Sequence, residues 1–148
     1  LHDYPNPFTM IRVEHLNKSF DGNQVLKDVS AHFERGKVNL IIGKSGSGKT
    51  VLVKCIVGLH KVDSGKILFD GKDITKYNLT EMNNLRRNIG MLFQGGALFD
   101  SLTVEENVMF PMSMFKDIPV SEMRERANEC LYQVNLEGKN ELYPSETS

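Results

Sequence analysis

The chain has 148 residues, of which 40% are apolar and 25% are charged, as in an ordinary globular domain. This composition excludes a disulfide-stapled miniprotein and a disordered acidic tail. The formal charge is −1 and no basic run occurs, which argues against nucleic acid or an anionic membrane surface as a partner. Because no apolar stretch approaches the ~20 residues that span a bilayer, we expect a cytosolic protein without direct membrane insertion. Cys55 and Cys130 lie far apart, which favours two reduced thiols.

The first third of the chain indicates short strands. Residues 1–9 carry two prolines and follow no period, so we expect a loose terminus or a tag remnant before a folded region at 10–148. Residues 11–20 and 25–33 are expected strands joined by a hairpin turn at Asp21-Gly22-Asn23. Residues 38–42 are β-branched and almost entirely apolar, which predicts a strand buried on both faces.

The middle of the chain alternates helices with strands. We expect a helix over 49–57, closed by Gly58, and a strand over 66–69 between two turns. A short helix over 80–87 then leads to a second buried strand at 89–93.

The remainder of the chain is predicted to be helical. Thr103 and Glu106 form a capping box, and Pro111 should kink or end the helix that follows. Ser121 is the expected cap of a second helix, which Gly138 stops. The apolar face of that helix comprises Met123, Ala127, Cys130, Leu131 and Val134, and Glu122 pairs with Arg126 on its outer face.

The strongest functional signal is a phosphate-binding loop that fits GxxxxGK[ST], and its residues are Gly43, Lys44, Ser45, Gly46, Ser47, Gly48, Lys49 and Thr50. Its glycines let successive backbone N–H groups converge on a polyanion at a helix N-terminus. Lys49 supplies a positive charge to the β- and γ-phosphates, and Thr50 offers its hydroxyl to Mg²⁺. The side chains of Lys44, Ser45 and Ser47 can be solvated while their backbone amides bind. The loop alone does not distinguish kinases, GTPases and transport ATPases.

The sequence around this loop resembles the ATPase subunit of ATP-binding cassette (ABC) transporters over residues 10–148. The similarity is carried by "LNKSFDGNQVLKDVSAHFERGKVNLIIGKSGSGKT", "IVGLHKVDSGKILFDGKDI" and "IGMLFQ". It implies an α/β P-loop NTPase fold of the ABC ATPase type, here truncated. An N-terminal antiparallel β subdomain and a partial parallel core reach to about residue 96, and part of a helical subdomain starts at about residue 97. The implied cofactors are ATP and Mg²⁺.

The resemblance also assigns individual roles. Phe20 stands at the position that stacks on adenine, with core packing as the alternative, and Val25 lies near the same pocket or in an ordinary strand core. Gln94 corresponds to the glutamine that binds Mg²⁺ or water, with a solvated turn residue as the alternative. The expected catalytic residues are therefore Lys49 and Gln94, and the expected metal ligands are Thr50 and Gln94.

Partners and cargo also follow from the resemblance. It implies a homodimer of ATPase subunits at the inner face of a bacterial membrane, bound to the coupling helix of a permease subunit. The soft apolar cluster Met109, Phe110, Met112, Met114 and Phe115 either borders that groove or forms the core of the helical subdomain. The segment "LFQGGALFDSLTVEENVMFPM" looks like the cassettes of Mce-domain lipid transporters, which favours a lipid cargo.

Several ABC motifs do not occur in this sequence. No apolar strand ending in Asp-Glu follows Gln94, and no histidine follows His60. The signature has only its lead-in at residues 143–146 and its first two places, with Thr147 where the family usually has Leu or Ile. We therefore expect the 148-residue chain to bind Mg-ATP without hydrolysing it. Two hypotheses stay open: a piece of an ABC transport ATPase, or a self-contained P-loop kinase or non-catalytic nucleotide-binding module.

Overall fold

The computed structural model describes residues 9–93, 95–114 and 118–147. The chain divides into two compact units, residues 1–90 and 91–148, and each unit is described here by itself. Among the described residues, no helix is long and apolar enough to cross a membrane.

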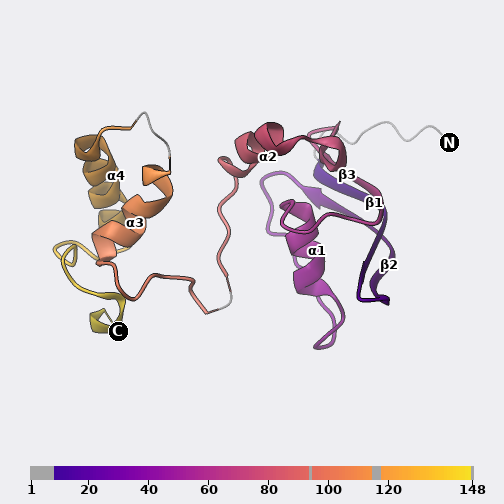
Figure 1. Ribbon diagram of the computed structural model, residues 1–148, viewed down its shortest axis with the longest axis horizontal. Helices are drawn as coiled ribbons and strands as arrows, with labels where there is room; N and C mark the ends of the chain where they lie inside the picture. Colours follow the sequence, from indigo (N-terminus) through magenta and orange to yellow (C-terminus); the bar gives the residue numbers. More distant parts are fainter. Residues whose placement is uncertain (1–8, 94, 115–117, 148) are drawn as a thin grey trace. The chain divides into compact units, whose positions relative to one another are not determined.

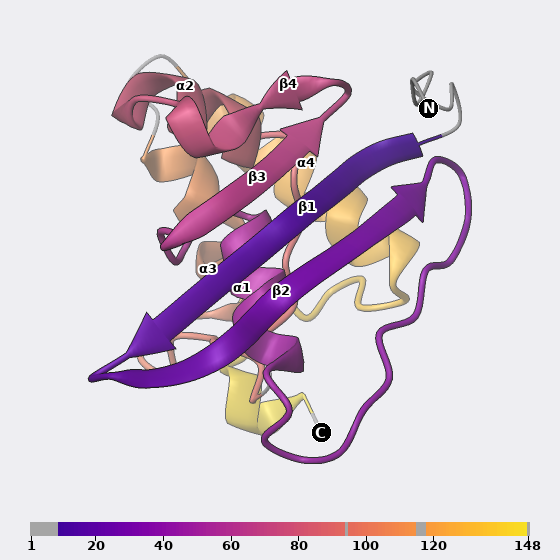
Figure 2. The ribbon, with the colours of Figure 1, turned by 90° about the vertical axis from the view of Figure 1, so that its right-hand side faces the viewer.

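The first unit is built on a four-stranded antiparallel sheet in the order β2-β1-β3-β4. Its strands are β1 (Thr9–Phe20), β2 (Asn23–Glu34), β3 (Ser64–Phe69) and β4 (Lys72–Asp73). Asp21 and Gly22 both have positive φ, 49° and 79°, as a tight two-residue hairpin turn requires, so the turn predicted there is confirmed. Figure 2 shows β1 lying between β2 and β3.

One face of this sheet packs against α1 (Lys49–Ile56). The buried cluster that joins them comprises Val13, Leu16, Leu26, Leu52, Cys55, Ile56, Ile67 and Ile74. A one-turn helix η1 (Ile74–Lys76) and then α2 (Leu79–Arg86) follow the sheet (Figure 1). The predicted helices over 49–57 and 80–87 are thus confirmed to within a residue at each end, and α2 starts with a capping box between Asn78 and Glu81.

The two strands predicted for a parallel core are corrected by the structure. Residues 38–42 and 89–93 are not strands, and Val38, Leu40 and Ile42 are 98%, 79% and 83% exposed. A strand exists only where a neighbouring strand pairs with its backbone. No described segment pairs with either of these two, so most of their apolar side chains are exposed, whereas Ile41 packs partly buried against the core of the first unit.

The second unit contains a pair of packed helices, α3 (Val104–Ser113) and α4 (Val120–Gln133), and a final turn η2 (Pro144–Glu146). The capping box at Thr103 and Glu106 is confirmed, with both reciprocal hydrogen bonds present. The helix α3 continues for two residues past Pro111.

Three expectations for α4 are corrected. Its N-cap is Pro119 rather than Ser121, so the helix starts one residue before the expected cap. It ends at Gln133, five residues before Gly138, because Asn135 adopts a left-handed φ of 58°. Its buried face is limited to Met123, Ala127 and Leu131, whereas Cys130 and Val134 are exposed. The predicted pair of Glu122 and Arg126 is present at 2.5 Å, and both cysteines are free, as expected.

Candidate nucleotide-binding site

The glycine-rich loop enters α1 directly, and β2 packs against its last residue. Gly48 is the N-cap of α1, and its carbonyl accepts the first helical hydrogen bond from Leu52 N at 2.8 Å. A Cβ on Gly48 would lie 3.0 Å from Leu26 Cδ2 and 3.2 Å from Val25 Cγ1, and Gly48 has a φ of 90°. Only glycine fits both the space and the backbone conformation here. The structure thus places Val25 against the end of the loop.

The loop backbone has the conformation that lets amide groups converge. Gly46 and Gly48 have φ values of 75° and 90°, and Ser47 between them does not share this left-handed conformation. Such an alternation turns consecutive N–H groups toward one side and creates a small anion-binding concavity. Ser47 N donates to Lys44 O at 3.2 Å, which closes the turn.

The positive charge at the N-terminal end of α1 is not offset by a side chain of the helix itself. No side chain caps this helix, and its first turn contains no acidic residue. The amide groups at a helix N-terminus carry the positive end of the helix dipole, and their hydrogen-bonding capacity is unused within the helix. This end of α1 therefore favours an anion.

Lys49 adds a full positive charge at the same place. Its Nζ donates to Gly43 O at 2.8 Å and to Lys44 O at 2.7 Å, so the ammonium lies over the loop backbone. A phosphate oxygen would offer this ammonium a charged acceptor in place of neutral carbonyls, and charged acceptors make the stronger hydrogen bonds. Thr50 is the second residue of α1 and its side chain is exposed, as are those of Ser45 and Ser47.

Phe20 lies at the end of β1 and is 38% exposed. Its ring meets the His60 ring edge-on, with centroids 5.2 Å apart, and Lys18 Nζ lies 4.9 Å from its centroid. Lys18 also pairs with Asp63 Oδ1 at 3.0 Å, and this hydrogen bond holds the pKa of Asp63 below its ordinary value. Sequence reasoning missed these neighbours, because nothing in the pattern linked His60, Lys18 or Asp63 to Phe20.

Gln94 and Phe115 lie outside the described residues, so their expected roles are not examined by the structure. The three residues after Gln94 all have left-handed φ values: 94° at Gly95, 83° at Gly96 and 55° at Ala97. Of the expected Met-rich cluster, Met109, Phe110 and Met112 are half-buried on α3 and Met114 is 70% exposed.

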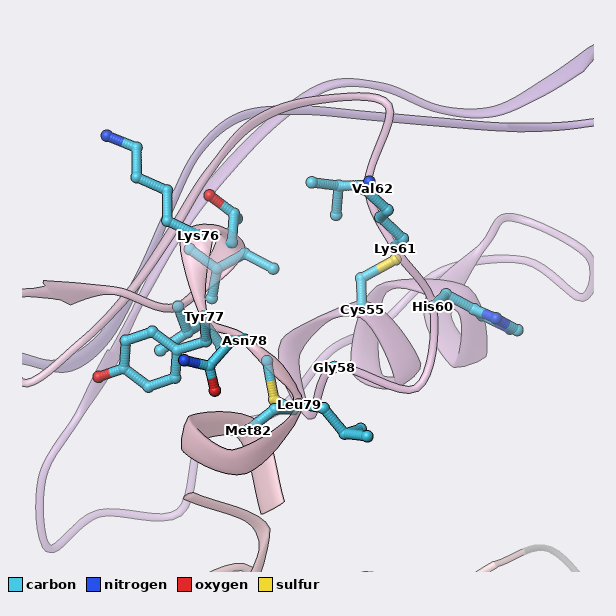
Figure 3. Close-up of a pocket in the computed structure, with 13 residues that line it drawn as sticks. Cys55, Gly58, His60, Lys61, Val62, Lys76, Tyr77, Asn78, Leu79 and Met82 are labelled. Atoms are coloured by element: carbon cyan, nitrogen blue, oxygen red, sulfur yellow. The ribbon is translucent and has the colours of Figure 1, made fainter. Parts of the chain in front are cut away.

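A cavity of about 510 Å³ lies at the other end of α1, away from the phosphate loop (Figure 3). Its lining includes Cys55, Gly58 and Met82. Arg86 reaches the same end of the helix from α2, with Nη2 donating to Gly58 O at 2.6 Å and Nε donating to Val57 O at 3.3 Å. The cavity lies between the C-terminal end of α1, β3 with η1, and the start of α2, and no residue of the loop at 43–50 lines it.

The described residues fit a metal bound together with phosphate rather than a protein-only metal site. They contain no group of three or more His, Cys, Asp or Glu side chains that could hold a metal ion. Magnesium in phosphate-loop proteins is held through substrate phosphates, a loop hydroxyl and a carboxylate from another strand, so Thr50 would be the ligand that this loop contributes.

Comparison with known sequences identifies relatives along almost the whole chain. The "Methionine import ATP-binding protein MetN" of Rhizobium johnstonii is 40% identical over 139 residues, which cover 94% of this chain and 38% of that protein. The "Probable ribonucleotide transport ATP-binding protein mkl" of Mycobacterium leprae is 37% identical over 138 residues, which cover 93% of this chain and 40% of that protein. The chain thus spans about two-fifths of the length of these curated relatives.

Solved structures show the same fold. A dimeric bacterial ABC transporter cassette, MJ0796, matches with a TM-score of 0.80 and 31% identity over 94% of this chain and 63% of that one. The protein cbiO1 of Clostridium perfringens, described as part of the ABC transporter complex cbiONQ, matches with a TM-score of 0.79 and 32% identity over 95% of this chain and 56% of that one. The fold class predicted from the sequence is therefore confirmed. The sequence profile described as "ABC transporter" matches residues 26–148, and the chain accordingly belongs to the ABC transporter family as part of its ATPase domain.

Proposed function

We propose that this chain binds Mg-ATP at residues 43–50 and forms part of the ATP-binding subunit of an ABC transporter. The observation that carries the proposal is the N-terminal end of α1. No side chain caps the amides there, the first helical turn contains no acidic residue, and the Lys49 ammonium lies over the adjoining loop. An anion of high charge is the ligand that such a site stabilises best.

Each residue of the site has one task in this proposal. The backbone amides of Gly43, Lys44, Ser45, Gly46, Ser47 and Gly48 surround the phosphates. Lys49 stabilises the charge on the β- and γ-phosphates, and Thr50 and Gln94 provide oxygen ligands for Mg²⁺. Phe20 and Val25 contact the base. The ring of Phe20 is held by its edge-on contact with His60 and by the ammonium of Lys18, which lies over it.

The assembly is proposed by similarity to the solved relatives. One of them is a dimeric cassette and another is part of a transporter complex, which supports a second copy of the subunit and a membrane permease as partners. The location that follows is the cytoplasmic face of a membrane. The 148-residue chain by itself is expected to bind ATP without turnover, because no strand ending in Asp-Glu follows Gln94.

The cargo rests on two observations that favour different molecules. Residues 92–112 resemble lipid-transport cassettes of the Mce type, which favours a lipid. The names of curated relatives at 36–40% identity instead specify methionine import, and that of a further one specifies ribonucleotide transport, so none of these relatives supports lipid. Deletion of the gene followed by uptake measurements with labelled methionine and labelled phospholipid distinguishes the two: loss of phospholipid transport alone supports the lipid proposal, and loss of methionine uptake alone refutes it.

ATP binding is tested by titrating a fluorescent ATP analogue in the presence of Mg²⁺. Lys49→Ala should weaken affinity by about 10- to 150-fold, because each hydrogen bond to a charged group contributes about 1.5–3 kcal/mol. Lys54→Ala is the matched control, since Lys54 lies in the last turn of the same helix, away from the loop. Equal affinities of the wild type and Lys49→Ala would show that the loop is not the phosphate site.

A further inference from the structure

Glu105 is the one charged residue that is buried among the residues the structure describes, with a side chain only 9% exposed. It is the second residue of α3, next to the capping box of Thr103 and Glu106. The proposed chemistry at residues 43–50 makes no use of it. A carboxylate is taken out of water at a cost, so its partners must compensate for the lost hydration.

The partners of the carboxylate come from two other segments. Arg124 of α4 donates from Nε to Glu105 Oε1 at 2.5 Å, and Asn140 donates from Nδ2 to Glu105 Oε2 at 3.2 Å. The Asn140 Nδ2 also donates to Asn128 Oδ1 of α4 at 2.6 Å. One carboxylate therefore binds α4 with one oxygen and the C-terminal segment with the other.

The backbone repeats this connection at the start of α3. Val104 N donates to Leu142 O at 2.8 Å and Glu105 N donates to Asn140 O at 3.1 Å. Amides in the first turn of a helix have no partner within that helix. Here the first two amides of α3 are paired with residues 140–142, while the Thr103 side chain accepts from the third.

The segment held in this way leads into a compact turn. Tyr143 N donates to Glu146 Oε2 at 2.7 Å, Glu146 N donates to Tyr143 O at 2.9 Å, and Thr147 Oγ1 donates to Pro144 O at 2.8 Å. The hydrogen bonds of this turn lie within it, and residues 140 and 142 supply the hydrogen bonds that tie the segment to α3 and α4.

We propose that Glu105 is the positioning residue of the C-terminal segment, residues 140–147, which it holds against α3 and α4. The inference rests on the proposed function in one respect: this segment includes the lead-in that resembles the ABC signature, so Glu105 would set how that lead-in is presented. A role as a metal ligand is not supported, because no group of metal-binding side chains occurs in the described part of the chain.

Hydrogen exchange measured peptide by peptide tests the proposal in the 148-residue chain. Glu105→Gln keeps the size of the side chain but removes its charge, so neither Arg124 nor Asn140 donates to a carboxylate any longer. Exchange should rise about 10-fold or more in peptides covering 103–107 and 140–147, since a charge-assisted contact is lost. Peptides from the middle of α4 should change by less than about 2-fold. Glu125→Gln is the matched control, because Glu125 is exposed on α4.

Asn140→Ala provides a second, independent variant that leaves the pair of Glu105 and Arg124 in place. It should reproduce the rise in 140–147 and leave α4 unchanged. An equal rise across α3, α4 and 140–147 would mean that Glu105 only stabilises the unit as a whole, and no rise in either variant would also overturn the proposal. The ATP affinity of the same variants should equal that of the wild type. If the wild type fails to bind ATP, the proposed function is refuted, but the hydrogen-exchange result still tests the role of Glu105.

Discussion

Replacing Gly48 by alanine tests how the phosphate loop is held in its conformation. Gly48 has a φ of 90°, and an added Cβ would lie 3.0 Å from Leu26 Cδ2 and 3.3 Å from the carbonyl oxygen of Val25. Gly46 has a φ of 75°, and an added Cβ would meet nothing within 4 Å. Both alanine variants therefore carry left-handed backbone strain, and only Gly48→Ala also crowds β2.

The two costs can be estimated separately. A left-handed φ costs a non-glycine residue about 1–2 kcal/mol, and alanine recovers about 0.4–1 kcal/mol by restricting the unfolded chain. Crowding a packed core costs about 1–3 kcal/mol more. We therefore expect the free energy of unfolding of the first unit to fall by about 1 kcal/mol in Gly46→Ala and by about 2–4 kcal/mol in Gly48→Ala.

Native-state hydrogen exchange of the β1 amides is the suitable measurement, because it reports the opening of the first unit independently of the second. The ratio of protection factors between the variants converts directly into the difference in free energy. Equal losses in Gly46→Ala and Gly48→Ala would refute the argument, since they would mean that Leu26 and Val25 do not confine the loop.

Three further predictions concern single side chains. Phe20→Leu should lower ATP affinity about 2- to 10-fold in the fluorescence titration, and unchanged affinity would limit Phe20 to packing against His60. Arg86→Met should lower the free energy of unfolding of the first unit by about 1–3 kcal/mol, read from exchange of the α1 amides, and equal protection in this variant would contradict the role of its hydrogen bonds. Burial raises the pKa of Glu105, but the hydrogen bonds from Arg124 and Asn140 outweigh it and leave the pKa below its ordinary value. The carboxylate thus stabilises the fold above about pH 4.3, and this stabilisation is lost as pH falls through the lower pKa of the folded state. The thermal midpoints of wild type and Glu105→Gln should differ at pH 7 and converge only as the pH falls through the lowered pKa of Glu105 in the folded state.

Local sequence signals predicted local structure well. The hairpin at Asp21 and Gly22 and the capping box at Thr103 depend on the backbone preferences of neighbouring residues, so a few positions contain the whole signal. The phosphate loop is also recognised from a few neighbouring positions, because its glycines are needed where the backbone is left-handed or where β2 packs closely.

Two further failures concern contacts between distant segments, whereas the cap and the end of α4 were local signals that the sequence analysis misplaced. Residues 38–42 have the composition of a buried strand, yet that composition only makes a segment suitable for pairing, and no described strand pairs with it. Glu105 was overlooked because it has distant partners that the local sequence does not indicate. Its position in the first turn of a helix predicts an exposed charge, and its burial results from Arg124 and Asn140, which lie 19 and 35 residues away.

The two ends of α1 differ in how the helix dipole is compensated, and this difference supports the proposed nucleotide site at its start. At the C-terminal end, Leu59 N and His60 N donate to Lys54 O, and Arg86 donates to the carbonyls of Val57 and Gly58. A cation at that end balances the negative pole of the helix dipole. At the N-terminal end no side chain caps the helix, and Lys49 adds positive charge to the positive pole. Among the described residues only the C-terminal pole is compensated by a side chain, so a bound anion would stabilise the N-terminal pole in the proposed function. Arg86 contributes to this asymmetry from α2, although it lies at the end of α1 opposite the phosphate loop.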